Sequence, residues 1–161
     1  MQFFEDKQNV LMLILAVVVL VAAVVSIVSE IPENEWKSAK LSFDVGGITA
    51  EGNVDLRDTE SIYTPKLTKC TGLHIMRDYD ADVTFTVFFF DAEDAFVSSV
   101  VVPGRQYNVE RGDMPVSEDG RQAIGFRLAV IYNDSKEAFS EYDAYKLGKK
   151  FDVEISTLAA E

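Results

Sequence analysis

The sequence predicts a mainly β domain, an antiparallel β-sandwich or small barrel, that follows one N-terminal transmembrane helix. Two observations carry this prediction. Residues 10–28 are apolar except for Ser26 and contain no charged side chain. From Leu41 onward, short segments that alternate apolar and polar residues are separated by turn signals, which is the pattern of strands with one buried face.

The uncharged segment has nineteen residues. As a helix it would be about 28 Å long, close to the ~30 Å hydrocarbon core of a bilayer. The chain therefore divides into a short tail (1–9), a transmembrane helix (10–28), a juxtamembrane linker (29–40) and a β-sandwich domain (41–161). Trp36 in the linker is either an interfacial aromatic anchor or a residue packed on the edge of the domain.

Three other interpretations of the apolar segment stay open. A buried core helix would keep a polar face, which this segment lacks. A cleaved secretory signal would follow a basic stretch, whereas here the leader carries Glu5 and Asp6 against Lys7. Type IV pilins resemble this start in having an acidic residue, Glu5, shortly before a long apolar helix. The prepilin leader that ends in Gly is missing, and Pro32 follows almost at once.

The chain is strongly acidic, with a formal net charge of −12, of which −11 belongs to residues 30–161. This charge argues against nucleic acid as a partner, because nucleic-acid binders need clustered Lys and Arg. It also disfavours a domain that lies flat on anionic lipid, so the expected lipid contact is the N-terminal helix. The single cysteine, Cys70, excludes an internal disulfide and is expected to be a small buried hydrophobe.

The basic residues near the apolar segment leave its orientation almost balanced. Lys7 lies on one side, and Lys37 and Lys40 lie on the other. A short tail before a large C-terminal domain is the usual form of an uncleaved signal anchor. We therefore expect a single-pass membrane protein whose domain is extracytoplasmic.

The clearest predicted strand is Val83–Phe90, which alternates strong β-formers and is followed by the acidic turn 91–94 and a return strand, Ala95–Val102. A second long strand is predicted at Gln122–Tyr132, and one short helix between Lys136 and Leu147. The shorter predicted strands are Leu41–Val45, Ile48–Val54, Leu73–Asp78, Arg105–Val109 and Lys150–Ser156. Seven to nine short strands of this kind are typical of a sandwich or small barrel.

Three segments carry a resemblance to a known family. They are VTFTVFFFDAEDAFVSS, which ends an aromatic strand in an acidic turn, the strand QAIGFRLAVIY, and the closing FDVEIS. Their order resembles jelly-roll domains related to carbohydrate-binding modules. The resemblance implies a jelly-roll-like antiparallel β-sandwich, and such domains bind glycans or serve as structural modules on surfaces.

Alternating carboxylates suggest one candidate metal site. Asp78, Asp80 and Asp82 could ligate Ca²⁺, although the residues that follow do not fit an EF-hand loop. The acidic turn that holds Asp91 and Asp94 lies at the other end of the same strand, about 26 Å away at 3.3 Å per residue, so the two groups cannot share an ion. The sequence predicts no cofactor other than this calcium ion, and solvated turn carboxylates are the simpler interpretation.

No catalytic residue is predicted. His74 is the only histidine, and no nucleophile-elbow motif accompanies it, so it is expected to be structural. The tripeptide Arg111-Gly112-Asp113 spells a signal that some adhesion receptors read, but three residues match easily by chance. The sequence therefore favours a protein that is not an enzyme.

Aromatic residues provide the candidate binding surface. If Phe85 and Phe89 face the core, Phe88 and Phe90 face the other side of the sheet, where exposed rings could stack on a sugar. The alternative is a central strand with both faces buried. The ligand-binding residues predicted with this platform are Tyr79, Phe88, Phe90, Asp91 and Asp94.

The sequence thus predicts a membrane-anchored, non-catalytic binding or adhesion module, with a glycan or a protein as its ligand. A structural subunit of an envelope or pilin-like filament assembly is the alternative.

Overall fold

The computed structural model describes residues 36–79, 81–133 and 138–157. Within these ranges the chain is mainly β, with antiparallel sheets and one short helix. No described helix is both long and apolar enough to cross a membrane, and the predicted span at 10–28 lies outside the described residues, as does the tail at 1–9.

One sheet has four antiparallel strands in the order β1-β12-β7-β10 among the described residues. The strands are β1 (Trp36–Ser38), β7 (Gly72–Arg77), β10 (Gln106–Val109) and β12 (Phe151–Ser156). Strand β1 was expected to belong to a linker, but it pairs with β12 along its whole length. The folded domain therefore begins at least five residues before the predicted boundary at Leu41.

The second sheet has the order β2-β5-β11-β8-β9, and β6 also pairs with β11. Its strands are β2 (Asp44–Val45), β5 (Ser61–Tyr63), β6 (Thr68–Lys69), β8 (Val83–Phe90), β9 (Phe96–Val102) and β11 (Gly125–Tyr132). Two further strands, β3 (Gly47–Ile48) and β4 (Val54–Asp55), form a separate hairpin.

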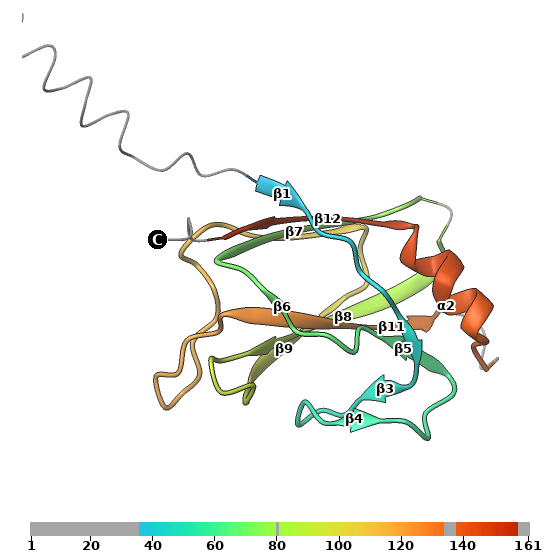
Figure 1. Ribbon diagram of the computed structural model, residues 1–161, viewed down its shortest axis with the longest axis horizontal. Coiled ribbons are helices and arrows are strands. Elements are labelled where there is room, and N and C mark those ends of the chain that lie inside the picture. Colours follow the sequence, from blue (N-terminus) through green and yellow to red (C-terminus); the bar gives the residue numbers. More distant parts are fainter. Residues whose placement is uncertain (1–35, 80, 134–137, 158–161) are drawn as a thin grey trace, which may run out of the picture. The chain divides into compact units, whose positions relative to one another are not determined.

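The two sheets lie in separate layers, with β1, β7 and β12 in one and β6, β8, β9 and β11 in the other (Figure 1). Alternate residues of each central strand point between the layers. Phe85, Leu128 and Val130 from one sheet share a hydrophobic core with Ile75 and Val153 from the other, and all five are almost fully buried. This arrangement is the sandwich that alternating sequence patterns produce.

The single described helix, α2 (Glu141–Gly148), lies at one end of the layers (Figure 1). Ser140 caps its N-terminus, because its hydroxyl accepts a hydrogen bond from the Asp143 backbone N–H while the Asp143 side chain accepts one from the Ser140 N–H. Ala144 and Leu147 face inward and are buried. The helix begins five residues later than the predicted start at Lys136, which lies outside the described residues.

The long predicted strands are confirmed, and the short ones differ in detail. Strand β8 has the predicted bounds, β9, β10 and β12 begin one residue later than predicted, and β7 is shifted by one residue at both ends. Strand β11 begins three residues after the predicted start at Gln122. The segment 48–54 is instead a hairpin that turns at Gly52, whose φ of 83° favours glycine. Strands β5 and β6 were not predicted, since two or three residues carry too little periodicity to detect.

Strand β1 yields a test of the domain boundary. A fragment of residues 34–161 should melt several degrees above a fragment of residues 41–161. The shorter fragment lacks β1, which pairs with the edge of β12, and it also lacks the half-buried side chain of Trp36. Loss of this cover should cost about 1–2 kcal/mol. Thermal melts followed by circular dichroism measure the difference, and equal melting temperatures would contradict a structural role for β1.

Candidate functional site

The outer face of the four-stranded sheet is polar, and no described element covers it. Register places Ser38, Glu154, His74 and Asn108 in one row across the four strands. The neighbouring row holds Asp152, Met76 and Gln106. Adjacent side chains in such rows are about 4.5–5.5 Å apart at Cβ, so they form a continuous surface. We call the residues Trp36, His74, Met76, Gln106, Asn108, Glu110, Asp152 and Glu154 the polar face.

Trp36 lies across one end of the polar face. Its ring stacks on the His74 imidazole, with centroids 3.8 Å apart and the planes inclined by 17°. Gly72 makes this approach possible, because a Cβ there would come within 2.9 Å of the indole. Trp36 is thus packed on the edge of the domain, which was one of its two predicted roles, and it adds an aromatic border to the polar surface.

Two carboxylates flank His74. Glu110 Oε1 lies 3.7 Å from Nε2, and Glu154 Oε2 lies 3.9 Å from Nδ1, so both are beyond hydrogen-bond distance. Nε2 is buried without a hydrogen-bond partner among the described residues. The imidazole is therefore held mainly by stacking on Trp36, and its Nε2 keeps an unused hydrogen-bonding capacity among the described residues.

The polar face is slightly hollowed. A cavity of about 250 Å³ is lined by His74, Ile75, Met76, Gln106, Asn108, Asp152 and Glu154. A larger cavity of about 570 Å³ lies between residues 38–43, helix α2 and β12, and Asp152 lines both. The first cavity brings two carboxylates, two carboxamides and an imidazole to one surface, which suits hydrogen bonding to a polar ligand.

The predicted aromatic platform is not exposed, and this prediction is wrong. Phe88 and Phe90 retain only 5% and 2% of their exposure. They form a second hydrophobic cluster with Tyr63 and Ala129 on the outer side of the six-stranded sheet. Phe96 packs against them, with its ring 6.3 Å from Phe88 and 6.2 Å from Phe90. The alternative interpretation, a central strand buried on both faces, is the correct one.

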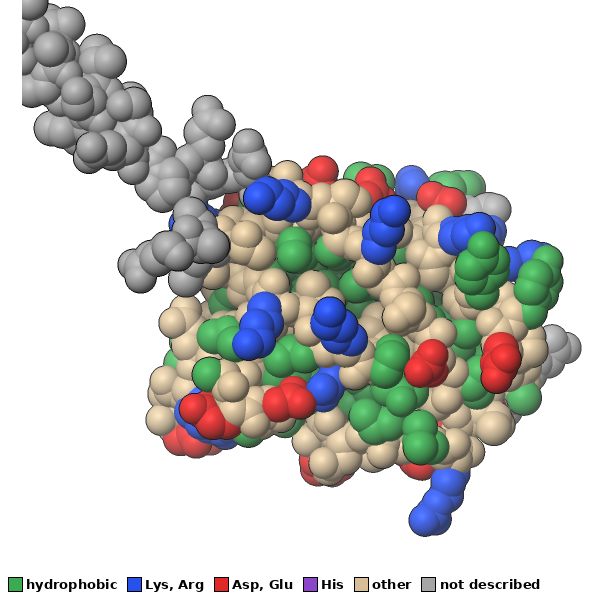
Figure 2. Space-filling view, in the orientation of Figure 1, with side chains coloured by type: hydrophobic (Ala, Val, Ile, Leu, Met, Phe, Trp, Pro, Cys, Tyr) green, Lys and Arg blue, Asp and Glu red, His purple; other side chains and the backbone are tan. Residues whose placement is uncertain are grey.

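The hairpin β3–β4 explains this burial. Ile48 packs against the second cluster, and the hairpin turn at Gly52 lies so close to Phe96 that a Cβ there would come within 2.7 Å of the ring. Hydrophobic side chains gather over this hairpin in Figure 2. Val54 in β4 and the nearby Leu56 are exposed. Charged side chains of both signs are scattered over the rest of the same view.

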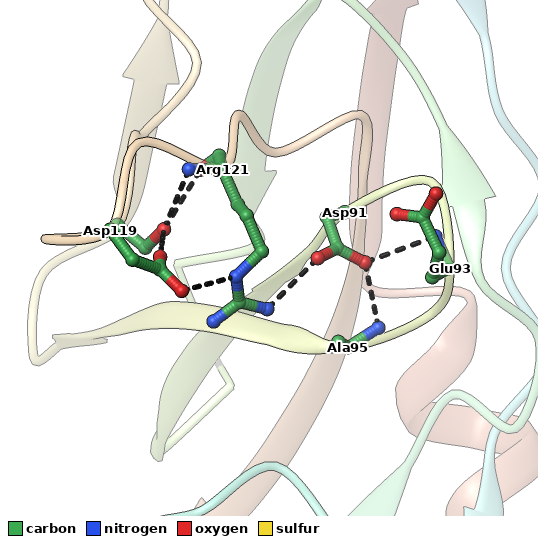
Figure 3. Close-up of polar contacts among 6 residues, drawn as sticks. Asp91, Glu93, Ala95, Asp119 and Arg121 are labelled. Atoms are coloured by element: carbon green, nitrogen blue, oxygen red, sulfur yellow. Dashed lines mark hydrogen bonds and ion pairs between the residues drawn. The ribbon is translucent and has the colours of Figure 1, made fainter.

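Asp91 is a structural residue in the turn after β8 (Figure 3). Its Oδ1 accepts hydrogen bonds from the backbone N–H of Glu93 and Ala95 at 3.0 and 2.8 Å. Its Oδ2 pairs with Arg121 at 2.9 Å, and Arg121 Nε pairs with Asp119 at 2.8 Å. The Ala95 N–H holds the pKa of Asp91 below its usual value, burial opposes this, and Arg121 lowers it further.

Asp94, also predicted to bind a ligand, is paired within the domain. It adopts a left-handed conformation with φ of 62°, which Asp tolerates better than most residues. Its Oδ2 accepts a hydrogen bond from Arg127 at 2.9 Å, and the Arg127 guanidinium also lies 4.7 Å above the Phe90 ring. Asp94 therefore helps to cover the second cluster, and both carboxylates of this turn act in the fold.

Tyr79, like Asp94, is a predicted ligand residue that is exposed. It follows β7, keeps 84% of its exposure, and its ring lies 5.1 Å from the Arg105 guanidinium carbon. Arg105 precedes β10, and its carbonyl accepts a hydrogen bond from the Arg77 N–H at 2.7 Å. Tyr79 and Arg105 therefore lie at the end of the sheet where Met76 and Gln106 lie, beside the polar face.

Two of the three predicted calcium ligands, Asp78 and Asp82, are among the described residues. Asp82 accepts a hydrogen bond from the Asn133 side chain at 2.6 Å, the Asp78 N–H bonds to the Lys150 carbonyl at 2.8 Å, and Asp80 lies outside the described residues. Among the residues described, no group of three or more His, Cys, Asp or Glu side chains is arranged to hold a metal ion.

Two other sequence features have clear positions. Cys70 is buried, as predicted, and burial raises the pKa of its thiol to about 12, partly offset by a hydrogen bond from the Gly72 backbone. The tripeptide Arg111-Gly112-Asp113 forms a turn in which the Asp113 N–H bonds to the Glu110 carbonyl at 3.1 Å. Gly112 has a φ of 88°, a backbone conformation that glycine adopts without strain, so glycine is needed here for the turn.

Sequence reasoning missed the polar face. Its signal was present, since β7 and β12 alternate buried apolar residues with His74, Met76, Asp152 and Glu154. That alternation predicts the strands but does not show which polar residues meet across the sheet. The pairing that joins these residues across the sheet, and the role of Trp36, depend on contacts distant in sequence.

Comparison of the chain with protein-family models, with curated proteins and with solved structures finds no match.

The second cluster yields a stability prediction. Phe88→Ala and Phe90→Ala should each cost about 3–5 kcal/mol, as buried Phe→Ala changes usually do, and lower the melting temperature by about 10 °C or more. Val101→Ala, at a position that is 64% exposed, is the control and should melt near the wild type. Near-native melting of both Phe variants would contradict the buried cluster.

Asp91 yields a pH prediction. Because its pKa is lowered on folding, its charge stabilises the native state fully above the unfolded value of about 3.9, and this contribution is lost as pH falls through the lower native value. Asp91→Asn should therefore be less stable than wild type near neutral pH, and the gap should narrow in acid. Urea melts at several pH values measure it, with Glu93→Gln as the control. A gap that does not change with pH would refute this role of the charge.

Proposed function

We propose that this protein is a non-catalytic binding module, anchored in a membrane by residues 10–28, displayed outside the cytoplasm, and directed at glycans. The single observation that carries the proposal is the polar face. It presents two carboxamides and two carboxylates in register beside an aromatic side chain, and no described element covers it. Sugar hydroxyls both donate and accept hydrogen bonds, so amide and carboxylate groups suit them.

Two features of this face indicate the kind of ligand. Its hydrogen-bonding groups come from three strands, so they can contact several hydroxyl groups of one ligand. Its charge is mainly acidic, from Asp152, Glu154 and Glu110, so anionic sugars are repelled. The ligand we infer is therefore a neutral oligosaccharide.

The strand order supports a jelly roll for this domain. The two-residue strands β2 and β6 are additions to the second sheet. If the other eight strands, β1, β5, β7, β8, β9, β10, β11 and β12, are counted from one to eight, the sheets have the orders 1-8-3-6 and 2-7-4-5. Two facing four-stranded sheets connected in this way are the double Greek key of a jelly roll. This is the architecture that the resemblance to carbohydrate-binding modules implies.

A second candidate function is a structural subunit of an envelope or filament assembly. The observation that favours it is the uncovered edge strand β9, which offers a surface for association. Filaments need a head-to-tail contact between two different surfaces, whereas one strand edge that pairs with its own copy gives a closed dimer. We therefore place glycan binding first.

The test uses the full chain in isolated membranes. The chain should sediment with membranes and capture neutral glycans from an array that also contains acidic ones. The variant Gln106→Ala/Asn108→Ala, which removes two polar side chains from the face, should bind about tenfold or more weakly, since each lost hydrogen bond is worth about 0.5–1.5 kcal/mol.

The matched control is Gln122→Ala/Asn53→Ala, because both residues are exposed and lie off the polar face. This control should bind as wild type does. Equal loss in both variants would assign binding to another surface, absence of any glycan capture would remove the glycan proposal, and a chain found in the soluble fraction would remove the anchor.

A further inference from the structure

The larger cavity, of about 570 Å³, lies between residues 38–43, helix α2 and strand β12, and it has no role in the proposed function. Its volume falls within the range of roughly 300–1,000 Å³ that is usual for small-molecule sites. Such sites are lined mostly by apolar side chains, with a few polar groups that orient the ligand. The apolar lining residues are Ala39, Leu41, Phe43, Ala144, Phe151 and Val153.

The apolar floor of this cavity is continuous with the hydrophobic core. Phe43, Phe151 and Val153 are buried members of the core, and the Phe43 and Phe151 rings lie 5.7 Å apart. Leu41 is partly buried and packs against this core. Gly148 keeps the end of α2 close to the floor, because a Cβ there would come within 3.2 Å of the Phe43 ring. The floor is therefore pre-formed, and an apolar group that enters the cavity displaces water from it.

Basic side chains from two separate segments line the same cavity. Lys40 follows β1, and Lys149 ends α2. Both are exposed, and neither forms an ion pair with a carboxylate among the described residues. The Lys149 ammonium lies 4.3 Å from the centre of the Tyr145 ring, which also lines the cavity. Asp152 is the only carboxylate among the described lining residues.

This basic rim is an exception in an acidic chain. Residues 146–150, KLGKK, contain three lysines, and no other stretch of five residues contains three basic side chains. Figure 2 shows basic and hydrophobic side chains close together over α2. Lysines at the C-terminus of a helix interact favourably with its dipole, but this role does not account for Lys40, which belongs to a different segment. A shared anionic ligand accounts for both lysines.

We propose that this cavity binds a small organic anion, a carboxylate joined to an apolar body such as an aromatic ring. The apolar body lies on the floor beside Phe43 and Phe151, and the carboxylate accepts hydrogen bonds from the Lys40 and Lys149 ammonium groups. Two ammonium groups and the Asp152 carboxylate leave one net positive charge on the described lining, which matches a monoanion. The polar face has its own cavity, so this inference goes beyond the proposed function and does not depend on it.

The test uses the full chain in nanodiscs of neutral phosphatidylcholine, with naphthaleneacetate as the probe and isothermal titration calorimetry as the measurement. Empty nanodiscs are titrated in parallel, so that partition of the probe into lipid can be subtracted. Naphthaleneacetate should bind. Naphthaleneethanol keeps the apolar body without the charge and should bind about tenfold or more weakly. Acetate, which keeps only the charged group, should show no binding.

The variant Lys40→Gln/Lys149→Gln tests the charged rim. It should weaken naphthaleneacetate binding about tenfold or more and leave naphthaleneethanol binding unchanged, because only the anion contacts the ammonium groups. The matched control is Lys66→Gln/Lys69→Gln, which removes the same charge from exposed lysines that do not line the cavity. This control should bind both probes as wild type does, and an equal loss in the control would overturn the proposal.

A second variant keeps both lysines and tests the cavity itself if the lysine variant misfolds. Ser42 is exposed and lines the cavity, so Ser42→Trp should fill the space and weaken binding of both probes. Its matched control is Ser99→Trp, at an exposed position on β9. A wild type that does not bind naphthaleneacetate, or that binds naphthaleneethanol equally well, would overturn the proposal. So would naphthaleneacetate binding that survives both Lys40→Gln/Lys149→Gln and Ser42→Trp.

Discussion

The paired strands β8 and β11 are the constraint on which the rest of the structure depends. Their antiparallel ladder runs over eight residue pairs, and β8 has an apolar inner face and two phenylalanines, Phe88 and Phe90, on its outer face. Such a ladder cannot be left with either face in water, because exposing a buried Phe costs roughly 1.5–3 kcal/mol. The four-stranded sheet covers one face. The β3–β4 hairpin, Leu67 and Phe96 cover the other, while Arg127 lies over the Phe90 ring.

This double covering decides where the molecule is free to interact. The six-stranded sheet buries most of both faces, and β2 and β9 form the ends of its strand order among the described residues. The four-stranded sheet buries one face and leaves the other to solvent, so polar side chains such as His74 and Glu154 gather there in register. The cavity beside α2 adjoins this face, because Asp152 lines both this cavity and the smaller one on the polar face.

The acidic turn after β8 illustrates how a cluster of carboxylates can serve the fold. Asp91 is almost fully buried and accepts two backbone N–H groups, so it closes the turn that returns the chain into β9. Arg121 joins this turn to the loop before β11, and Arg127 joins Asp94 to the second cluster. The carboxylates of Asp91 and Asp94 are therefore used in ion pairs that hold the turn in place.

The sequence by itself determined the mainly β class, the bounds of β8 and, within a residue, those of β7, β9, β10 and β12. These bounds could be predicted because alternation and β-propensity are local signals. The burial of Cys70 could be predicted from its residue type, since a free cysteine usually behaves as a small hydrophobe. The tertiary structure decided which faces are exposed. The sequence pattern around Phe88 and Phe90 is the same whether these side chains are exposed or buried. They are buried because the β3–β4 hairpin, which is distant in sequence, packs on their side of the sheet. Likewise, Trp36 joins the sheet by pairing with Ser156, which is 120 residues later in the sequence. Such long-range contacts leave no periodic trace in the chain, so the polar face, the β1 strand and the cavity beside α2 become visible only when the sheets are assembled.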